Sequence, residues 1–380
     1  MITQKKITNP FVTVGYNGCE LFCDREKEVK TLLSNAQNGV NTTLISIRRM
    51  GKTGLIYHFF EHLNQNKTME NLFVDLYETQ TLKEFTEKFA SALYQKFPER
   101  KSLGEKFKKF IMGLSPIISY DTLTEKPEIR FTFYDTVQCE QSLKSLFMFL
   151  EQQNVPIVIA FDEFQQIANY PEKNTEAILR TIIQTLRNCN FIFSGSNRHI
   201  INEMFASSKR PFFASTQFLA LTTIDNRKYY TFIESIFEKY KKKIAPESIE
   251  FILEWTRCHT YYTQMVCNHV FRKSNKELIS LEFVKWVCKE ILEEQEVVFT
   301  QYRNLLPPVQ WELLKAIAKE KDATALTRSS FLKQYHLTLS GSQRALTSLI
   351  NKEMVYVEYL KDTTYYYLYD CFFSRWMERL

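Results

Sequence analysis

The sequence predicts an α/β fold with a parallel sheet, followed by an all-α domain and a third domain of mixed structure. In the first part, short apolar runs alternate with helical patterns, which implies right-handed crossovers and a parallel sheet. From Asp225 onward, one helical pattern follows another, and Leu306-Pro307-Pro308 then interrupts the chain. We therefore expect domains over residues 1–224, 225–304 and 305–380.

Apolar runs and hydrophobic periodicity place the elements of each domain. The expected strands of the sheet are residues 42–47, 72–76, 155–161, 190–193 and 217–221, with a separate hairpin over 117–120 and 128–133. Helices are expected between them over residues 53–64, 82–97, 101–112, 142–152 and 175–187. The all-α domain is expected to contain helices 227–242, 246–257, 261–273 and 280–303.

The third domain has three helical patterns and then two β-like runs. The helices are expected over residues 309–319, 328–335 and 340–352, and the strands over 354–360 and 364–368. Three helices followed by a β-hairpin is the element order of a winged helix.

The bulk composition is that of a globular protein without secretion or membrane signals. The 380 residues carry a net charge of +6, too mild to indicate a dedicated nucleic-acid binder. The eight cysteines form no CxxC pair, and we interpret them as reduced, mostly buried thiols. The chain has no signal-peptide pattern and no run of about 18 apolar residues, so we expect a cytoplasmic protein.

The clearest motif runs from Ser46 to Thr53, SIRRMGKT, between an expected strand and an expected helix. It resembles the phosphate loop GxxxxGK[ST], with Ser46 in place of the first glycine. Gly51 allows the backbone amides to face the phosphates, Lys52 reaches the β- and γ-phosphates, and the Thr53 hydroxyl ligates Mg²⁺. The alternative is a chance GKT sequence at a strand–helix junction.

A second motif supports the first. The apolar run Ile157–Phe161 ends in Asp162 and Glu163. A phosphate-loop site needs an acid at the end of a neighbouring strand to hold the Mg²⁺ shell, and Asp162 has that place. Glu163 is then the candidate general base that polarises the attacking water. The alternative is a buried strand that ends in a solvated turn.

Polar residues also follow the strand expected at 190–193. Ser194, Ser196 and Asn197 are candidates for a polar group near the γ-phosphate, and Arg198 is a candidate to stabilise the transferring phosphate. A polar turn with an exposed arginine is the alternative.

These motifs together resemble the archaeal-type ATPases, a family of AAA+-like and STAND-like P-loop proteins also found in Bacteroidetes. The segments that carry the resemblance are Phe22–Glu28, Ile47–Thr53, Phe161–Phe164 and Phe193–Ser196. The resemblance implies an ATPase core, a helical lid and a C-terminal winged helix. It also implies that Asn9–Phe11 and Phe22–Glu28 lie by the adenine. The residues expected to bind ATP are Phe22, Arg25, Ser46, Arg48, Arg49, Met50, Gly51, Lys52, Thr53 and Gly54.

The chain departs from the family pattern at two places. Glycine is usual where Ser46 stands. The family's lid often carries Gly-His-Pro-Tyr-Tyr, where this chain has Cys258-His259-Thr260-Tyr261-Tyr262. The loss of that glycine and proline puts the usual contact between the lid and the base in doubt.

The expected third helix of the winged helix begins with polar residues. Ser340, Ser342, Gln343 and Arg344 suit the end of a helix that enters the major groove of DNA. Residues 301–380 hold 11 basic and 8 acidic side chains, a net charge of only +3. The alternative is therefore a winged helix that contacts protein.

The function predicted from these features is that of an ATP-binding, Mg²⁺-dependent ATPase with slow turnover that acts as a conformational switch or motor. The catalytic candidates are Lys52, Glu163 and Arg198, and the metal ligands are Thr53 and Asp162. The alternative is a DNA-binding regulator in which ATP is a structural or switching ligand. A third hypothesis is a nucleotide-binding scaffold that does not hydrolyse quickly. The expected partners are ATP or ADP, with DNA, another protein or a second copy of the chain as further candidates.

Overall fold

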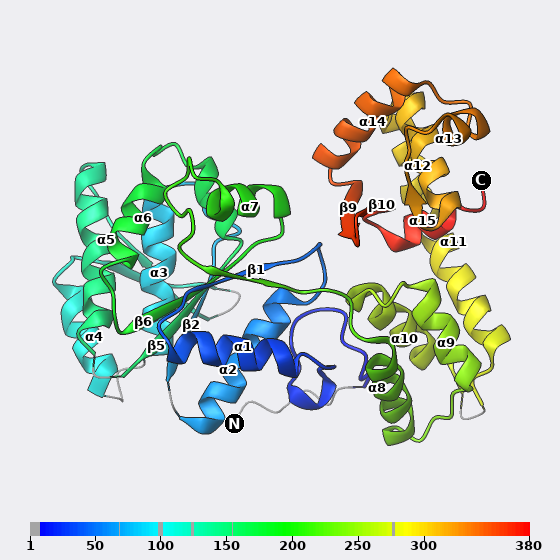
Figure 1. The fold of residues 1–380 in the computed structure, drawn as a ribbon. Helices are drawn as coiled ribbons and strands as arrows, with labels where there is room; N and C mark the ends of the chain where they lie inside the picture. Colours follow the sequence, from blue (N-terminus) through cyan, green and yellow to red (C-terminus); the bar gives the residue numbers. More distant parts are fainter. Residues whose placement is uncertain (1–7, 68, 98–101, 123–124, 154, 276–277) are drawn as a thin grey trace. The chain divides into compact units, whose positions relative to one another are not determined.

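The computed structural model describes residues 8–67, 69–97, 102–122, 125–153, 155–275 and 278–380. The chain forms two compact units. The sheet unit contains residues 15–46 and 51–222, and the helical unit contains residues 8–14, 47–50 and 223–380. Figure 1 shows the elements of both units, which are described separately below.

The sheet unit is built on five parallel strands in the order β2-β5-β6-β1-β7. The strands are β1 (Thr42–Ile45), β2 (Glu70–Asp75), β5 (Ile157–Asp162), β6 (Cys189–Ser194) and β7 (Gln217–Ala220). Each runs within one or two residues of the range expected from its apolar run. The predicted α/β fold with a parallel sheet is confirmed.

Helices cover both faces of this sheet (Figure 1). They are α1 (Glu26–Gln37), α2 (Lys52–Asn66), α3 (Leu82–Lys96), α4 (Ser102–Met112), α5 (Thr136–Glu151), α6 (Thr175–Ile183) and α7 (Arg198–Ala206). A small hairpin of β3 (Ile117–Tyr120) and β4 (Pro127–Arg130) lies beside α3.

The central strand β5 shows why both faces need cover. All six of its residues are buried. Val158 and Ala160 belong to the core beneath α1 and α2, whereas Ile159 and Phe161 belong to the core on the opposite face. Because successive side chains of a strand point to opposite faces, this continuous apolar run requires a helical layer on each side.

Four helices differ from the prediction, and in two of them, α5 and α7, a side chain caps the first turn. Helix α5 begins six residues early, since the Asp135 side chain accepts a hydrogen bond from Gln138 N at 2.8 Å. Helix α7 was not predicted, and it begins where Asn197 accepts a hydrogen bond from Ile200 N. Helix α6 ends at Ile183, four residues early, in a tighter turn closed by Leu186 N and the Ile183 carbonyl. Helix α1 was also not predicted.

The helical unit begins with four helices that match the predicted all-α segment. They are α8 (Asn226–Lys239), α9 (Pro246–Trp255), α10 (Thr260–Lys273) and α11 (Leu281–Leu305). Pro246 is the first residue of α9, where its missing N–H costs nothing. Phe11 is buried in this unit, with its ring 5.0 Å from that of Phe237 and 6.0 Å from that of Phe271.

The C-terminal part of the helical unit is a winged helix, as predicted. Its elements are α12 (Pro308–Glu320), β8 (Ala323–Thr324), α13 (Ser329–Gln334), α14 (Leu339–Asn351), β9 (Val355–Leu360), β10 (Thr363–Leu368) and α15 (Cys371–Met377). The strands pair in the order β8-β10-β9. Helix α15 was not predicted; Phe373 packs there against Phe299 of α11 and Trp311 of α12.

None of the helices in the described ranges is both long enough and apolar enough to cross a lipid bilayer. All eight cysteines are free, and six of them are buried, as expected for structural thiols.

Phe193 lies at the centre of an aromatic cluster behind β5 and β6, so we expect its truncation to destabilise the sheet unit. Its side chain is fully buried, and its ring centre lies 4.5 Å from that of Phe164 and 5.2 Å from that of Phe205. Phe193→Ala should lower the free energy of unfolding by about 3–5 kcal/mol. Phe213→Ala is the control, because the Phe213 side chain is 46% exposed and should cost about 0.5 kcal/mol or less. Urea titrations followed by circular dichroism would contradict this account if the two variants shifted the midpoint equally.

Candidate functional site

The turn between β1 and α2 has the geometry of a phosphate-binding loop. Gly51 adopts φ +93° and ψ 26° at the N-cap of α2, a conformation that glycine adopts without strain. Arg49 is also left-handed, with φ +62°. Lys52 and Thr53 are the first two residues of α2, so the helix directs its free amides and its positive end toward the turn.

Ser46 lies against the lysine of this loop. The Ser46 and Lys52 side chains are both buried, and Lys52 Nζ donates a hydrogen bond to Ser46 Oγ at 3.1 Å. Ser46, which replaces the usual glycine, does not need a positive φ angle. Its hydroxyl oxygen accepts a hydrogen bond from the Lys52 ammonium. The sequence showed that serine is small, but it did not show this contact.

Asp162 joins three elements at the carboxyl edge of the sheet. One of its carboxylate oxygens accepts a hydrogen bond from Thr53 Oγ1 of α2 at 2.5 Å. The other accepts from Ser194 Oγ, at the end of β6, also at 2.5 Å. A threonine hydroxyl beside a carboxylate is a pair of hard oxygen ligands, and these residues fit Mg²⁺ by the chemistry of their donors. No group of three His, Cys, Asp or Glu side chains suited to a metal is found among the described residues.

Glu163 follows Asp162 and is held by the tip of the neighbouring strand. Its carboxylate accepts hydrogen bonds from the Ser196 hydroxyl at 2.7 Å and from Gln165 Nε2 at 2.5 Å. Its backbone is left-handed, with φ +55°, a conformation that costs a non-glycine residue free energy and that persists only where its surroundings impose it. These contacts fix the carboxylate at the end of β5, beside Asp162.

Gly195 makes room for this arrangement. A Cβ atom at residue 195 would lie 2.0 Å from Gln165 Oε1 and 2.8 Å from the Ile201 side chain. Any larger residue would displace Gln165, whose amide holds Glu163. Neither Gln165 nor its contact with Gly195 was found from the sequence, because the two lie on different elements.

The remaining residues after β6 have separate places. Asn197, a sequence candidate for contact with the γ-phosphate, uses its side-chain oxygen to cap α7. Arg198 is the first residue of α7 and is partly exposed. The catalytic role expected of Arg198 stays a prediction.

Phe22 and Arg25 differ in how far they suit the adenine contact implied by the family pattern. The Phe22 ring stacks on His58 of α2 at 4.5 Å, and a Cβ at Gly54 would come within 3.2 Å of it. Phe22 therefore lies against the first turns of the phosphate-loop helix. Arg25 is 3% exposed and donates hydrogen bonds to the Thr222 carbonyl at 2.7 Å and to Glu28 at 2.8 Å. Its guanidinium is thus engaged within the sheet unit.

Two family models match this chain. Residues 22–263 match a family model described as "ATPase domain predominantly from Archaea", and residues 297–379 match one described as "Probable winged helix domain". The chain belongs to this ATPase family. The search of curated proteins finds no match.

Solved structures show the same fold. The Walker-type ATPase of Pyrococcus abyssi is 18% identical and superposes with a TM-score of 0.65 over 98% of this chain and 100% of its own. The ORC2 protein of Aeropyrum pernix, solved as ADPNP and ADP complexes, is 15% identical with a TM-score of 0.59 over 97% of this chain and 95% of its own. At these identities the likeness concerns the fold: an AAA+-like parallel sheet, a helical region and a winged helix.

Residues 47–50, the tip of the loop between β1 and α2, pack within the helical unit. His259 Nε2 lies 3.2 Å from the Arg48 carbonyl, and Thr260 Oγ1 donates to the Met50 carbonyl at 3.2 Å. The Arg49 guanidinium lies 4.5 Å from the centre of the Tyr261 ring. The segment where the family's glycine and proline are missing therefore contacts the loop tip.

The winged helix contributes one ion pair to the same tip. Arg48 pairs with Glu353, which follows α14. The Arg48 side chain is 51% exposed, so water and salt screen the ion pair. Its contribution to the free energy of unfolding is therefore small.

The start of α14 presents fewer polar groups than the sequence suggested. Ser342 is 2% exposed and its hydroxyl has no hydrogen-bond partner among the described residues. The expectation that Ser342 reads DNA is therefore wrong, because the side chain faces the core of the winged helix. Ser340, Gln343 and Arg344 are exposed.

Buried His259 makes the stability of the helical unit depend on pH. Burial lowers the pKa of His259 from its ordinary 6.5 to about 4. A carbonyl only accepts hydrogen bonds, so Nε2 carries the proton of the neutral ring.

The unfolded chain thus binds a proton more readily than the folded one, and the free energy of unfolding falls as the pH drops from about 6.5 toward 4. We expect this residue to account for about 2 kcal/mol of lost stability at pH 5 relative to pH 7.5. Urea titrations at both pH values should show a smaller loss in His259→Gln than in the wild type. The same loss in both proteins would rule out His259 as the titrating group.

Proposed function

We propose that this protein is a Mg²⁺-dependent ATP hydrolase that acts as a conformational switch or motor. The observation that carries the proposal is the hydrogen bond between Thr53 and Asp162, with Glu163 fixed beside it. A chance GKT sequence near an acidic strand end would not be expected to bring the Thr53 hydroxyl, the Asp162 carboxylate and Glu163 together. Membership of the ATPase family supports the same reading.

The binding roles follow from the loop geometry. The amides after Gly51 and the Lys52 ammonium are proposed to hold the β- and γ-phosphates. Thr53 and Asp162 would hold Mg²⁺, which neutralises charge on the phosphate oxygens when bound. Phe22 is proposed to contact the adenine, since aromatic rings bury the flat face of a base.

In the hydrolytic step, a water oxygen forms a bond to the γ-phosphorus while the bond from that phosphorus to the β–γ bridging oxygen breaks. Glu163 accepts the water proton, and ADP and phosphate are the products. In the present geometry Ser196 and Gln165 already donate to the Glu163 carboxylate. Each donated hydrogen bond favours the charged form and weakens it as a base, which supports slow turnover.

The switching role rests on the division of one loop between the two units. Lys52 and Thr53 belong to the sheet unit, whereas Arg48, Arg49 and Met50 pack within the helical unit. These residues are adjacent in the chain, so a rearrangement of the loop around phosphate must change the torsion angles or the contacts of its tip. Nucleotide state would then bias the helical unit.

Lys52→Ala and Glu163→Gln separate binding from hydrolysis. Lys52→Ala should abolish ATP binding because it removes the phosphate-binding charge. Glu163→Gln should retain ATP binding but lower turnover by about 100-fold or more, since general-base catalysis contributes about 10²–10⁴. Fluorescent-nucleotide titration and phosphate release are the measurements. Lys173→Ala, which changes an exposed lysine of the same unit, is the control. Unchanged affinity and activity in Lys52→Ala would refute the proposal.

The alternative, a DNA-binding regulator, is favoured by one observation. Gln343 and Arg344 are exposed in the first turns of α14, the position at which a winged helix meets the major groove.

If α14 enters DNA, Arg344→Ala in the full chain should weaken duplex binding by about 5- to 100-fold. Fluorescence anisotropy with a labelled duplex at several salt concentrations measures this, since phosphate contacts give a steep salt dependence. Arg227→Ala removes an exposed arginine of α8 and should have no such effect. Equal binding by wild type and both variants would assign the winged helix to protein contact.

A further inference from the structure

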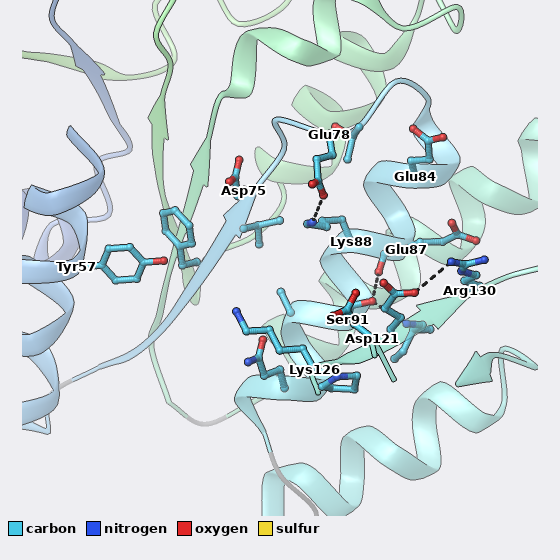
Figure 2. Close-up of a pocket in the computed structure, with 18 residues that line it drawn as sticks. Tyr57, Asp75, Glu78, Glu84, Glu87, Lys88, Ser91, Asp121, Lys126 and Arg130 are labelled. Atoms are coloured by element: carbon cyan, nitrogen blue, oxygen red, sulfur yellow. Dashed lines mark hydrogen bonds and ion pairs between the residues drawn. The ribbon is translucent and has the colours of Figure 1, made fainter. Parts of the chain in front are cut away.

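The sheet unit contains a groove that the proposed ATPase function does not use. It lies between the β2 edge of the sheet and the β3–β4 hairpin, over one face of α3 (Figure 2). Its volume is about 730 Å³, enough for several residues of an extended peptide. No residue of the phosphate loop lines it.

The groove opens onto a free strand edge. Among the strands in the described ranges, β2 pairs only with β5. Phe73, Val74 and Asp75, the last three residues of β2, line the groove. The outer edge of a terminal strand carries backbone N–H and C=O groups that another strand can pair with.

The floor and far wall of the groove are fixed. Its floor is the face of α3 that carries Glu84, Lys88 and Ala92, residues spaced four apart. Its far wall is β4, and hydrogen bonds from β4 and from the residue after it hold this strand to α3. Ile129 N donates to Ser91 Oγ at 2.8 Å, and Phe131 N donates to Glu87 Oε1 at 2.7 Å.

The groove is acidic, whereas the chain as a whole is basic. The acidic lining residues are Asp75, Glu78, Glu84, Glu87, Asp121 and Glu128, and the basic ones are Lys88, Lys126 and Arg130. The groove thus carries a net charge of −3 in a chain whose net charge is +6. Two of the cations are already paired, Lys88 with Glu78 at 3.0 Å and Arg130 with Glu128 at 3.2 Å.

We propose that this groove binds an extended segment of a partner protein that bears Lys or Arg at alternate positions and pairs as an added strand with β2. Main-chain hydrogen bonds to β2 supply affinity, and the carboxylates select the basic side chains. Alternate residues of a strand share one face, so one face of the segment meets the carboxylates. The same negative charge repels nucleic acid, which sets this surface apart from the winged helix.

The test uses the full chain and the labelled peptide acetyl-Lys-Val-Lys-Val-Lys-Val-Lys-amide. Fluorescence anisotropy at low salt should show saturable binding at least about tenfold tighter than for the matching Glu-Val peptide. A version with proline in place of the central valine lacks one backbone donor and should bind at least about fivefold more weakly. Hydrogen exchange should slow at residues 70–75 when the basic peptide binds.

Two charge-reversal variants locate the binding. Glu78→Lys with Glu128→Lys reverses two exposed carboxylates of the groove and should weaken the basic peptide by about tenfold or more. Glu238→Lys with Glu247→Lys makes the same change of net charge at exposed residues of the helical unit and is the control. Equal binding of acidic and basic peptides, an equal effect of the two double variants, or unchanged exchange in residues 70–75 would each overturn the proposal. Because Glu78 and Glu128 lie outside the nucleotide site, loss of peptide binding with normal ATP turnover separates this result from the ATPase proposal.

Discussion

The buried carboxylate of Asp162 is the interaction on which the site depends. It is 5% exposed, and a charged group removed from water to this degree is costly unless hydrogen bonds compensate. Thr53 and Ser194 supply those bonds from the helix after β1 and from the end of β6. The hydrogen bonds of Asp162 therefore require one relative position of β5, β6 and α2. A change in the register of β5 would break them and leave the carboxylate buried without donors.

The aromatic core on the face of the sheet opposite α1 and α2 holds the ends of β5 and β6 rigidly in place. Phe161 directly precedes Asp162, and its ring lies parallel to that of Phe191 with centres 6.2 Å apart. Phe193 directly precedes Ser194 and is stacked at 6.3 Å from Phe161. Asp162 and Ser194 thus each follow a residue fixed in a close-packed core, where displacement costs packing energy. The packing of these apolar side chains therefore determines where the carboxylate and the hydroxyl lie.

The sequence predicted what is encoded locally and missed what arises from three-dimensional contact. The continuous apolar run before Asp162 identified a strand buried on both faces, and the motif around Lys52 identified the glycine turn that begins α2. By contrast, α7 depends on a single asparagine cap, and α5 begins with polar residues that show little periodicity. The clamp on Glu163 joins Gln165, Gly195 and Ser196 across two strand ends, and the contact between Ser46 and Lys52 closes a turn. Periodicity and short motifs do not reveal side-chain contacts that form only when the chain folds.

The adjacent residues Arg48 and Arg49 belong to the phosphate-loop motif, yet their side chains make contacts within the helical unit. In a loop that only bound phosphate, two adjacent arginines would add positive charge without a fixed direction. Here the Arg49 guanidinium is placed over Tyr261, and Arg48 combines a carbonyl contact to His259 with an ion pair to Glu353. Each of these contacts is weak by itself, worth about 1 kcal/mol or less at exposed positions. Weak contacts suit the switching role proposed above, since a strongly bonded tip would hold the loop in one conformation. In that proposal the two arginines link the loop to the helical unit, while Lys52 and the helix amides hold the phosphates; nucleotide binding by Arg48 and Arg49 stays a prediction.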